Sequence, residues 1–261
     1  FKIENTCFKF KDSDIFLSKN IISEDDLIEH FYKQNYKVLT RKRVNNDKNA
    51  KTDYIVFTGT YKILKDFFEQ EAHKIGDFTL ITVESDFFEL KKEWLETLNL
   101  KGWYTWNAPF SHPKLFNIPI GLNKDRQIKS YLNFKENSEK NKLLLINFSP
   151  ETHSEREEVL KIASKWDFVT KGKRLPNHRS YKIKSLSENC EIKVDETNYE
   201  YFNYLSEFKF VLSPRGAGVD CHRTWEALYV GSIPIVRSDC IDELYTDLPI
   251  LIINDWNEIS E

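Results

Sequence analysis

The chain has 261 residues, of which 40% are hydrophobic and 14% aromatic, enough for one large domain or two ordinary ones with a sizeable core. The net charge is only -3 and the basic residues form no long run, which argues against a nucleic-acid-binding face. The four cysteines are scattered without a CxxC pair, so neither a disulfide framework nor a structural zinc site is expected.

No apolar run reaches the roughly 20 residues that a membrane-spanning helix needs, so no membrane span is expected. The chain shows no secretory signal, and reduced, scattered cysteines are typical of a cytoplasmic protein. The sequence contains no methionine, which indicates that residue 1 is not the natural start and that targeting segments could have been lost.

Short apolar runs alternate with segments of helical periodicity, which predicts α/β architecture with largely parallel sheets. In the first half, strands are expected at 54–59, 77–85, 101–106 and 114–122, and helices at 61–75 and 92–100. In the second half, strands are expected at 142–149, 167–172 and 249–255, a helix at 151–166, and a helix running into a strand over 197–214. Thr152 or Ser154 is expected to cap the helix at 151–166.

The polar segment 126–141 has no sustained periodicity and is expected to link two Rossmann-like domains, residues 1–125 and 142–261. The alternative is a surface helix or loop inside a single domain. Two α/β units joined in this way predict a cleft between them. Ligands of open α/β sheets bind beyond the carboxyl ends of the strands, so the site is expected in the loops that follow them.

The stretch LSPRGAGVDCHRTWEALYVGSIPIV, residues 212–236, reads as strand, glycine loop, helix and strand. The helix is expected to begin at Asp220, whose carboxylate would cap the first turn, and to stop at Gly231. Gly216 and Gly218 would let the backbone turn sharply and approach a ligand closely. A helix N-terminus reached through such a loop favours anions.

Charged side chains around this loop point to a diphosphate. Arg215 and Arg223 are planar, permanent cations suited to bidentate phosphate contacts. Glu226 would repel phosphates and is expected to accept hydrogen bonds from ribose hydroxyls, with His222 nearby. The simpler reading makes Arg223 and Glu226 an ion pair within the helix and Asp220 only a cap. It leaves Arg215, His222 and the paired glycines unexplained.

Two common nucleotide motifs do not fit the loop. GAGVDC has Cys221 where a dinucleotide fingerprint has its third small residue, and no acidic residue follows at the expected distance. The loop also lacks the GK[ST] of a P-loop. A nicotinamide enzyme and a P-loop kinase are therefore disfavoured.

The stretch FKFVLSPRGAGVDCHRTWEALYVGSIPIVRSD, followed by LPILIINDW, closely resembles the nucleotide-sugar-binding half of exostosin-like glycosyltransferases. The stretches FTLITVESD, KGWYTWNAPFSHPKLFNIPIGLN and LLLINFSPETHSEREEVL resemble the same wider group less sharply. The resemblance covers most of Phe78 to Trp256 and is strongest from Lys209 onward.

The resemblance implies two Rossmann-like domains facing a cleft, the GT-B arrangement. It also implies inverting transfer from a UDP-sugar to a glycan or glycoprotein acceptor without an essential metal or other cofactor. Carried over by position, Arg215 and Arg223 would hold the diphosphate and Glu226 the ribose. Asp220 and His222 would line the loop near the phosphates or the donor sugar.

Inverting transfer needs a base that takes the proton of the acceptor hydroxyl. The candidates are Glu84 and Asp86, just past the strand FTLITV, and His112 in PFSHPKL. In simpler readings Asp86 caps the following helix and His112 belongs to a turn before Pro113. The family pattern has asparagine or histidine where this chain has Val83 and Glu84, which bears on the acceptor side of the site.

Trp103, Tyr104 and Trp106 form an aromatic cluster that would suit a sugar platform. Core packing is the commoner role and is expected for at least one of the two tryptophans. Trp225 and Leu228 are expected to pack on the sheet.

Two other classes of function remain open beside a glycosyltransferase. One is a non-catalytic nucleotide- or glycan-binding module of the same fold. The other is a sulfotransferase that uses the same helix N-terminus for a phosphoadenosine cofactor. Turnover of a donor sugar tests the first, and a preference for uridine over adenosine tests the second.

Overall fold

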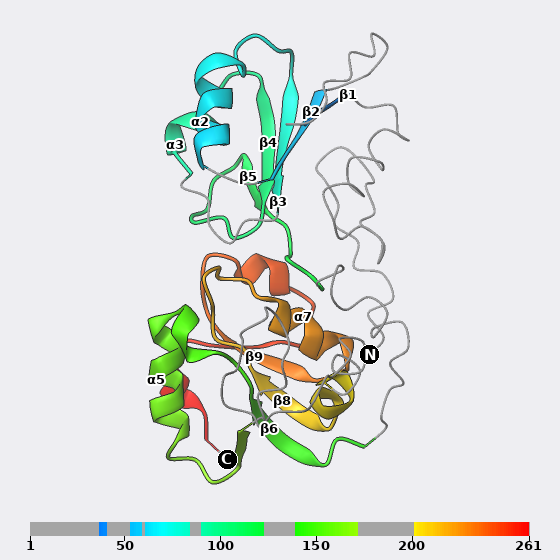
Figure 1. Ribbon diagram of the computed structural model, residues 1–261, viewed down its shortest axis with the longest axis vertical. Helices are drawn as coiled ribbons and strands as arrows, with labels where there is room; N and C mark the ends of the chain where they lie inside the picture. The colour runs from blue at the N-terminus through cyan, green and yellow to red at the C-terminus, as the bar shows by residue number, and fades with distance from the viewer. Residues whose placement is uncertain are drawn as a thin grey trace, which may run out of the picture.

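The computed structural model describes residues 37–40, 53–58, 61–83, 90–122, 139–171 and 201–260; for 37–40, 53–58 and 61–63 it describes the backbone alone. Within these residues the strands form two parallel sheets, in the order β1-β2-β3-β4-β5 and β10-β9-β8-β6-β7 (Figure 1). The predicted α/β class with parallel, Rossmann-like sheets is confirmed. The predicted linker lies largely outside the described residues, and the domain limits stay a prediction.

The first sheet is covered by helices on the side seen at the left of Figure 1. Its strands are β1 (Lys37–Thr40), β2 (Asp53–Thr58), β3 (Phe78–Val83), β4 (Leu100–Thr105) and β5 (Leu115–Asn117), and its helices are α2 (Tyr61–Gln70) and α3 (Lys92–Leu95). Phe67 of α2 and Trp94 of α3 join Phe78 and Trp103 in one buried cluster. Trp103 therefore packs in the core, as expected for at least one tryptophan of its segment.

The second sheet has apolar layers on both faces, as parallel sheets require. Its strands are β6 (Lys142–Ile146), β7 (Val169–Lys171), β8 (Phe208–Leu212), β9 (Ile233–Arg237) and β10 (Leu251–Ile253). The helical segments are η1 (Pro150–Thr152), α5 (Ser154–Ala163), residues 201–206, α7 (His222–Tyr229), η2 (Asp242–Tyr245) and η3 (Trp256–Glu258). Leu145 and Val211 pack with Phe202 on one face, whereas Leu212 packs with Trp256 on the other.

Several sequence-based boundaries are wrong. The helix expected at 61–75 ends at Gln70 in α2. The helix expected at 92–100 has only the four residues of α3, because the Asn99 amide donates to the carbonyls of Ala72, Ile75 and Gly76 and draws the chain away. The strand expected at 114–122 ends at Asn117 in β5. Pro119 follows soon after and has no N–H for the ladder.

The expected start of α5 is also wrong. His153 is its N-cap, and the ring Nδ1 accepts a hydrogen bond of 3.2 Å from the amide of Glu155. The expected caps Thr152 and Ser154 fall on either side of it. An imidazole nitrogen thus does here what a serine or threonine hydroxyl does in most helices.

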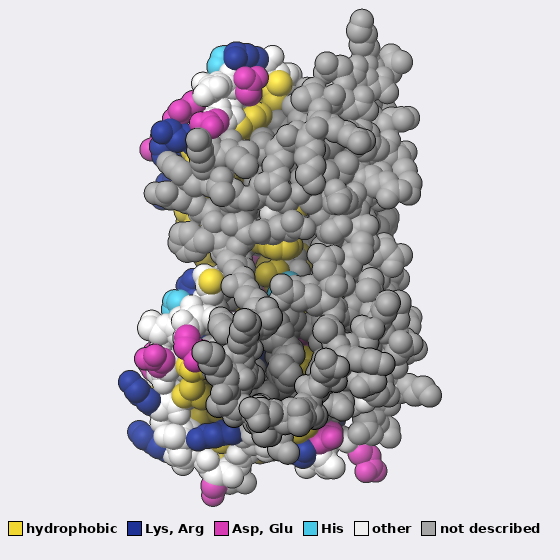
Figure 2. All heavy atoms as spheres, in the orientation of Figure 1, with side chains coloured by type: hydrophobic (Ala, Val, Ile, Leu, Met, Phe, Trp, Pro, Cys, Tyr) yellow, Lys and Arg dark blue, Asp and Glu magenta, His cyan; other side chains and the backbone are white. Residues whose placement is uncertain are grey.

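The surface carries both signs of charge. On the face in Figure 2, acidic and basic side chains are interspersed along the left edge of the described parts. No helix among the described residues is long and apolar enough to cross a membrane.

Candidate functional site

The loop that joins β8 to α7 lies at the carboxyl end of the second sheet. Ser213 directly follows β8, and its hydroxyl lies 2.8 Å from the hydroxyl of Thr224 in the first turn of α7. The N-cap of α7 is Cys221, and the helix begins at His222. The prediction that Asp220 caps the helix is therefore wrong, although the predicted stop is right, with Gly231 in the left-handed region at φ 73°.

Asp220 instead anchors the first half of the chain to α7. Its carboxylate is 2% exposed and accepts from the Ile120 amide at 2.8 Å and from the Trp225 indole at 2.9 Å. The Tyr245 hydroxyl donates to it at 3.4 Å. Burial raises the pKa of Asp220 to about 6. These hydrogen bonds occupy the acceptor positions of the carboxylate, so Asp220 positions the loop. The predicted contact of Asp220 with the sugar donor stays a prediction.

Gly216 and Gly218 are glycines because side chains press against them. Neither has a positive φ, but the chain does turn sharply here, with bends at residues 217–220 and a hydrogen bond of 3.0 Å from the Gly216 amide to the Gly218 carbonyl. A Cβ on Gly216 would lie 2.9 Å from the Arg156 guanidinium, and one on Gly218 would lie 2.4 Å from the Asn107 amide nitrogen. Both contacts are closer than carbon atoms tolerate. The predicted closeness of these glycines to a ligand stays a prediction.

Arg156, from the first turn of α5, organises the loop and was missed by the sequence analysis. It is 5% exposed and donates to the carbonyls of Arg215 at 2.8 Å, Ser149 at 3.0 Å and Pro214 at 3.3 Å. Burial lowers the pKa of its guanidinium to about 10, and the Arg223 cation acts in the same direction. An arginine in the sequence SEREEV gives no local sign that it will be buried.

Arg215 and Arg223 each keep a buried donor without a partner among the described residues. Arg223 donates from Nε to the Asn147 carbonyl at 2.9 Å, yet its Nη1 is buried and unbonded. The Nε of Arg215 is in the same condition, and its Nη1 lies 3.7 Å from Asp239. Leaving such a donor buried costs about 1–3 kcal/mol. An anion at the loop would recover that cost.

Glu226 and His222 have well-defined places. The Glu226 carboxylate is 2% exposed inside the fold and accepts from the Tyr201 hydroxyl at 2.9 Å. Its negative charge and burial raise the pKa of Tyr201 well above the usual value, burial being the larger cause. His222 is half-buried and its Nδ1 donates to the Gly121 carbonyl at 2.7 Å. Their predicted contacts with ribose and phosphate are untested.

The three candidate bases differ in what the structure shows. Glu84 and Asp86 lie outside the described residues. His112 is described: its Nδ1 accepts from the Lys114 amide at 3.1 Å and its Nε2 lies 3.5 Å from Glu96. These contacts match the simpler reading of His112 as a turn residue. The role of base stays a prediction for all three.

Asn107 is a second residue that the sequence analysis missed. It follows β4, lies in the left-handed region at φ 53° and is 8% exposed. Its Oδ1 accepts from the Asp220 amide at 2.6 Å, while its Nδ2 is buried without a partner among the described residues. Asparagine tolerates this backbone region better than most residues. An amide from the first sheet is thus pressed against the loop of the second.

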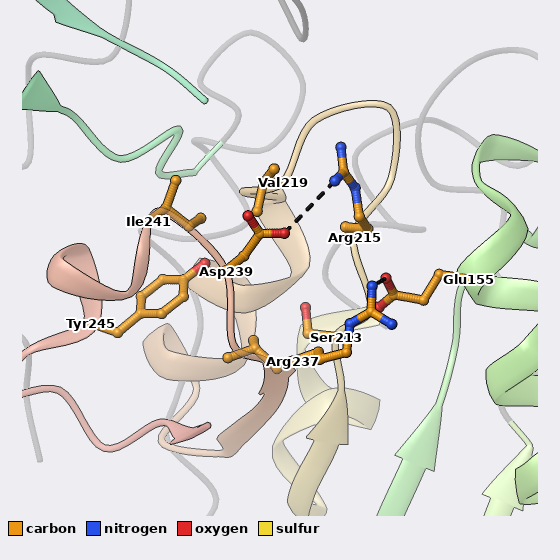
Figure 3. A pocket seen from close by; sticks show the side chains of 9 residues that line it. Glu155, Ser213, Arg215, Val219, Arg237, Asp239, Ile241 and Tyr245 are labelled. Carbon is orange, nitrogen blue, oxygen red and sulfur yellow. Dashed lines mark ion pairs between the residues drawn. The ribbon is translucent and has the colours of Figure 1, made fainter. Parts of the chain in front are cut away.

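A pocket opens beyond Arg215, where β8 and β9 end (Figure 3). Glu155, Arg215, Arg237 and Asp239 line it with Ser213. Apolar side chains complete the lining: Val219, Val236 and Ile241, with Tyr245. Its position beyond the carboxyl ends of parallel strands is where open α/β sheets bind ligands.

Comparison with protein families matches residues 126–261 to the family described as RXYLT1 C-terminal domain, slightly more than half of the chain. The chain belongs to this family. RXYLT1 is a ribitol xylosyltransferase, so the predicted enzyme class, a glycosyltransferase, is confirmed. The match does not name the exostosin-like family, and that resemblance stays a prediction. A comparison with curated proteins found no match.

The matched segment contains the whole loop and helix with Arg215, Arg223 and Glu226, together with Arg156. The three candidate bases precede it. The family match therefore bears on the side of the site where the donor is expected.

Proposed function

We propose that this glycosyltransferase moves a xylosyl group from UDP-xylose to a ribitol-bearing glycan or glycoprotein acceptor. The name of the family, that of a ribitol xylosyltransferase, supports the proposed sugar and acceptor class. UDP is the nucleotide implied by the exostosin-like resemblance. The proposed site for the nucleotide sugar rests on one observation: Arg215 and Arg223 each have a buried N–H group without a hydrogen-bond partner among the described residues.

The loop suits a diphosphate leaving group for a physical reason. Two guanidinium groups beside a helix N-terminus stabilise the negative charge that grows on the leaving phosphate. Arg156 donates to the loop carbonyls of Arg215 and Pro214 and adds a third cation, a buried one, near Arg223. We propose that these cations replace a divalent metal, so that transfer needs no metal ion.

The proposed reaction inverts the anomeric carbon. The acceptor oxygen forms a bond to that carbon while the bond from the carbon to the diphosphate oxygen breaks. The electron pair of the broken bond leaves with UDP, and the proton of the acceptor hydroxyl passes to a base. We place the base in the first half of the chain, at Glu84, Asp86 or His112, across a cleft of the GT-B kind.

Contacts between the two sheets support a shared site. The Ile120 amide and the Asn107 side chain from the first half both bond to Asp220. The Cys240 thiol, which follows β9, donates to the Ala108 carbonyl at 3.1 Å. The loop after β8 and the segment after β4 therefore lie against each other, as transfer from one half to an acceptor on the other requires.

The experiment that tests the donor site is calorimetric titration with UDP, GDP, CDP and ADP in EDTA, on wild type and on Arg223→Ala, with the exposed Lys161→Ala as a control of equal charge change. We expect UDP to bind best without metal, and the Arg223 variant to lose at least about tenfold in affinity, as a lost charge-assisted contact implies. Equal UDP affinity in both variants would show that the diphosphate lies elsewhere.

A transfer assay with UDP-xylose and a ribitol-bearing acceptor tests the sugar and the acceptor. Release of UDP only when both are present supports the proposal. Selective UDP binding with transfer of a different sugar would keep the diphosphate site and refute the xylosyl assignment.

A further inference from the structure

Two carboxylates line the pocket beyond Arg215, and each faces an arginine (Figure 3). One of them is paired with its arginine. Glu155 is 5% exposed, its Oε2 pairs with Arg237 at 2.6 Å, and its Oε1 accepts from the Trp256 indole at 3.2 Å. Glu155 and Arg237 thus form a neutralised wall of the pocket.

Asp239 is the carboxylate that can still accept further hydrogen bonds. Its Oδ1 accepts from the Cys240 amide at 2.7 Å. Its Oδ2 lies 3.7 Å from Nη1 of Arg215, which is an ion pair but too long for a hydrogen bond. The side chain is 28% exposed, so solvent or a ligand can reach it.

The turn after β9 holds Asp239 in place. Its amide donates to the Asp242 carboxylate at 3.0 Å, and the Ser238 hydroxyl donates to the same carboxylate at 2.6 Å. The Asp242 amide donates back to the Asp239 carbonyl at 3.1 Å. Asp239 is therefore set in position before any ligand arrives, which lowers the entropy cost of binding.

A site for a diphosphate alone would gain nothing from a carboxylate beside its arginine, because like charges repel. A carboxylate next to a guanidinium does suit a pair of sugar hydroxyls, since the carboxylate accepts from them and the guanidinium donates to them. Val219, Val236 and Ile241 line the same pocket. Its volume of about 10 Å³ admits one hydroxyl-sized group, so a sugar would lie at the mouth of the pocket with a hydroxyl directed at Asp239.

We propose that Asp239 binds the donor sugar by accepting hydrogen bonds from its hydroxyls, with Arg215 between the sugar and the diphosphate. This inference rests on the proposed function, because it takes the diphosphate to lie at Arg215 and Arg223. In this arrangement Asp239 distinguishes a nucleotide that carries its sugar from one that does not.

The two ligands should respond to Asp239→Asn in opposite directions. The substitution keeps the shape but removes the negative charge. UDP should bind as well as before or more tightly, because a repelling charge has gone. UDP-xylose should lose at least about tenfold relative to UDP, because an amide is a weaker acceptor than a carboxylate for hydroxyl donors.

The measurement is the ratio of the dissociation constants for UDP and UDP-xylose, determined by calorimetry on one preparation of the full chain. Asp247→Asn is the matched control, because Asp247 is exposed, lies outside the pocket and has φ 64°, which asparagine tolerates. The control should leave the ratio unchanged. If Asp239→Asn does not fold, Asp239→Ala gives the same ratio.

Wild-type protein that binds neither ligand would refute the proposed function, and with it this inference. Wild-type protein that binds both would uphold the donor site. In that case, an unchanged ratio in the Asp239 variant overturns the role of Asp239 alone.

Discussion

The Arg156 side chain holds the loop between β8 and α7 through hydrogen bonds to backbone carbonyls. Replacing Arg156 therefore gives the sharpest test of how the site is built. Arg156→Met leaves the carbonyls of Ser149, Pro214 and Arg215 without this donor. Two of these hydrogen bonds are only partly buried, so about 1 kcal/mol for each is a fair value and about 3 kcal/mol is lost in all. For a chain of this size the melting temperature should fall by about 6–12 °C.

Gly216→Ala makes the test specific to the Arg156 contact. The added Cβ would meet the guanidinium at 2.9 Å, so the alanine should destabilise wild type. In the Arg156→Met variant that guanidinium is absent, so Gly216→Ala should lower the free energy of unfolding clearly less than in wild type. Urea unfolding of the four chains gives the coupling energy, and calorimetry with UDP shows whether the loop still binds. Additive effects of the two substitutions would refute the account of Gly216.

Two further predictions concern the junction between the halves. Gly218→Ala should lower the melting temperature, because its Cβ would lie 2.4 Å from the Asn107 amide nitrogen; adding Asn107→Gly should restore part of the loss, and no rescue would contradict the contact. The raised pKa of Asp220, about 6 against 3.8, means that the folded state binds a proton more tightly than the unfolded state between these values. The stability of wild type relative to Asp220→Asn should therefore fall by about 2 kcal/mol as the pH rises from 4 to 7, and a difference that is constant with pH in urea unfolding would refute this.

The layers of the fold could be predicted because they depend on local patterns. The strand expected at 77–85 is β3, Phe78–Val83, since a strand that is buried on both faces of a parallel sheet is largely apolar. The helix expected at 92–100 failed because the Asn99 amide found three carbonyls beyond α2, a competition that local propensity does not contain.

The charges of the candidate site could also be predicted, but not their partners. Arg215 and Arg223 were recognisable as cations beside a glycine loop, and both keep a donor that is unbonded within the described part of the chain. The contact that explains Gly218 comes from Asn107, which has no signal in the sequence. Asp220 was recognisable as a buried polar residue only once Ile120 and Trp225 were seen to surround it.

The sequence by itself determined the parallel α/β layers and the cationic loop, because periodicity and residue charge are local properties of the chain. Only the tertiary structure decided why the loop has its glycines, which carboxylate in the pocket keeps acceptor capacity, and how the two sheets meet. Those features depend on pairs such as Asn107 and Asp220, which bond across 113 positions of the chain. A contact between residues so far apart leaves no trace in the pattern around either one.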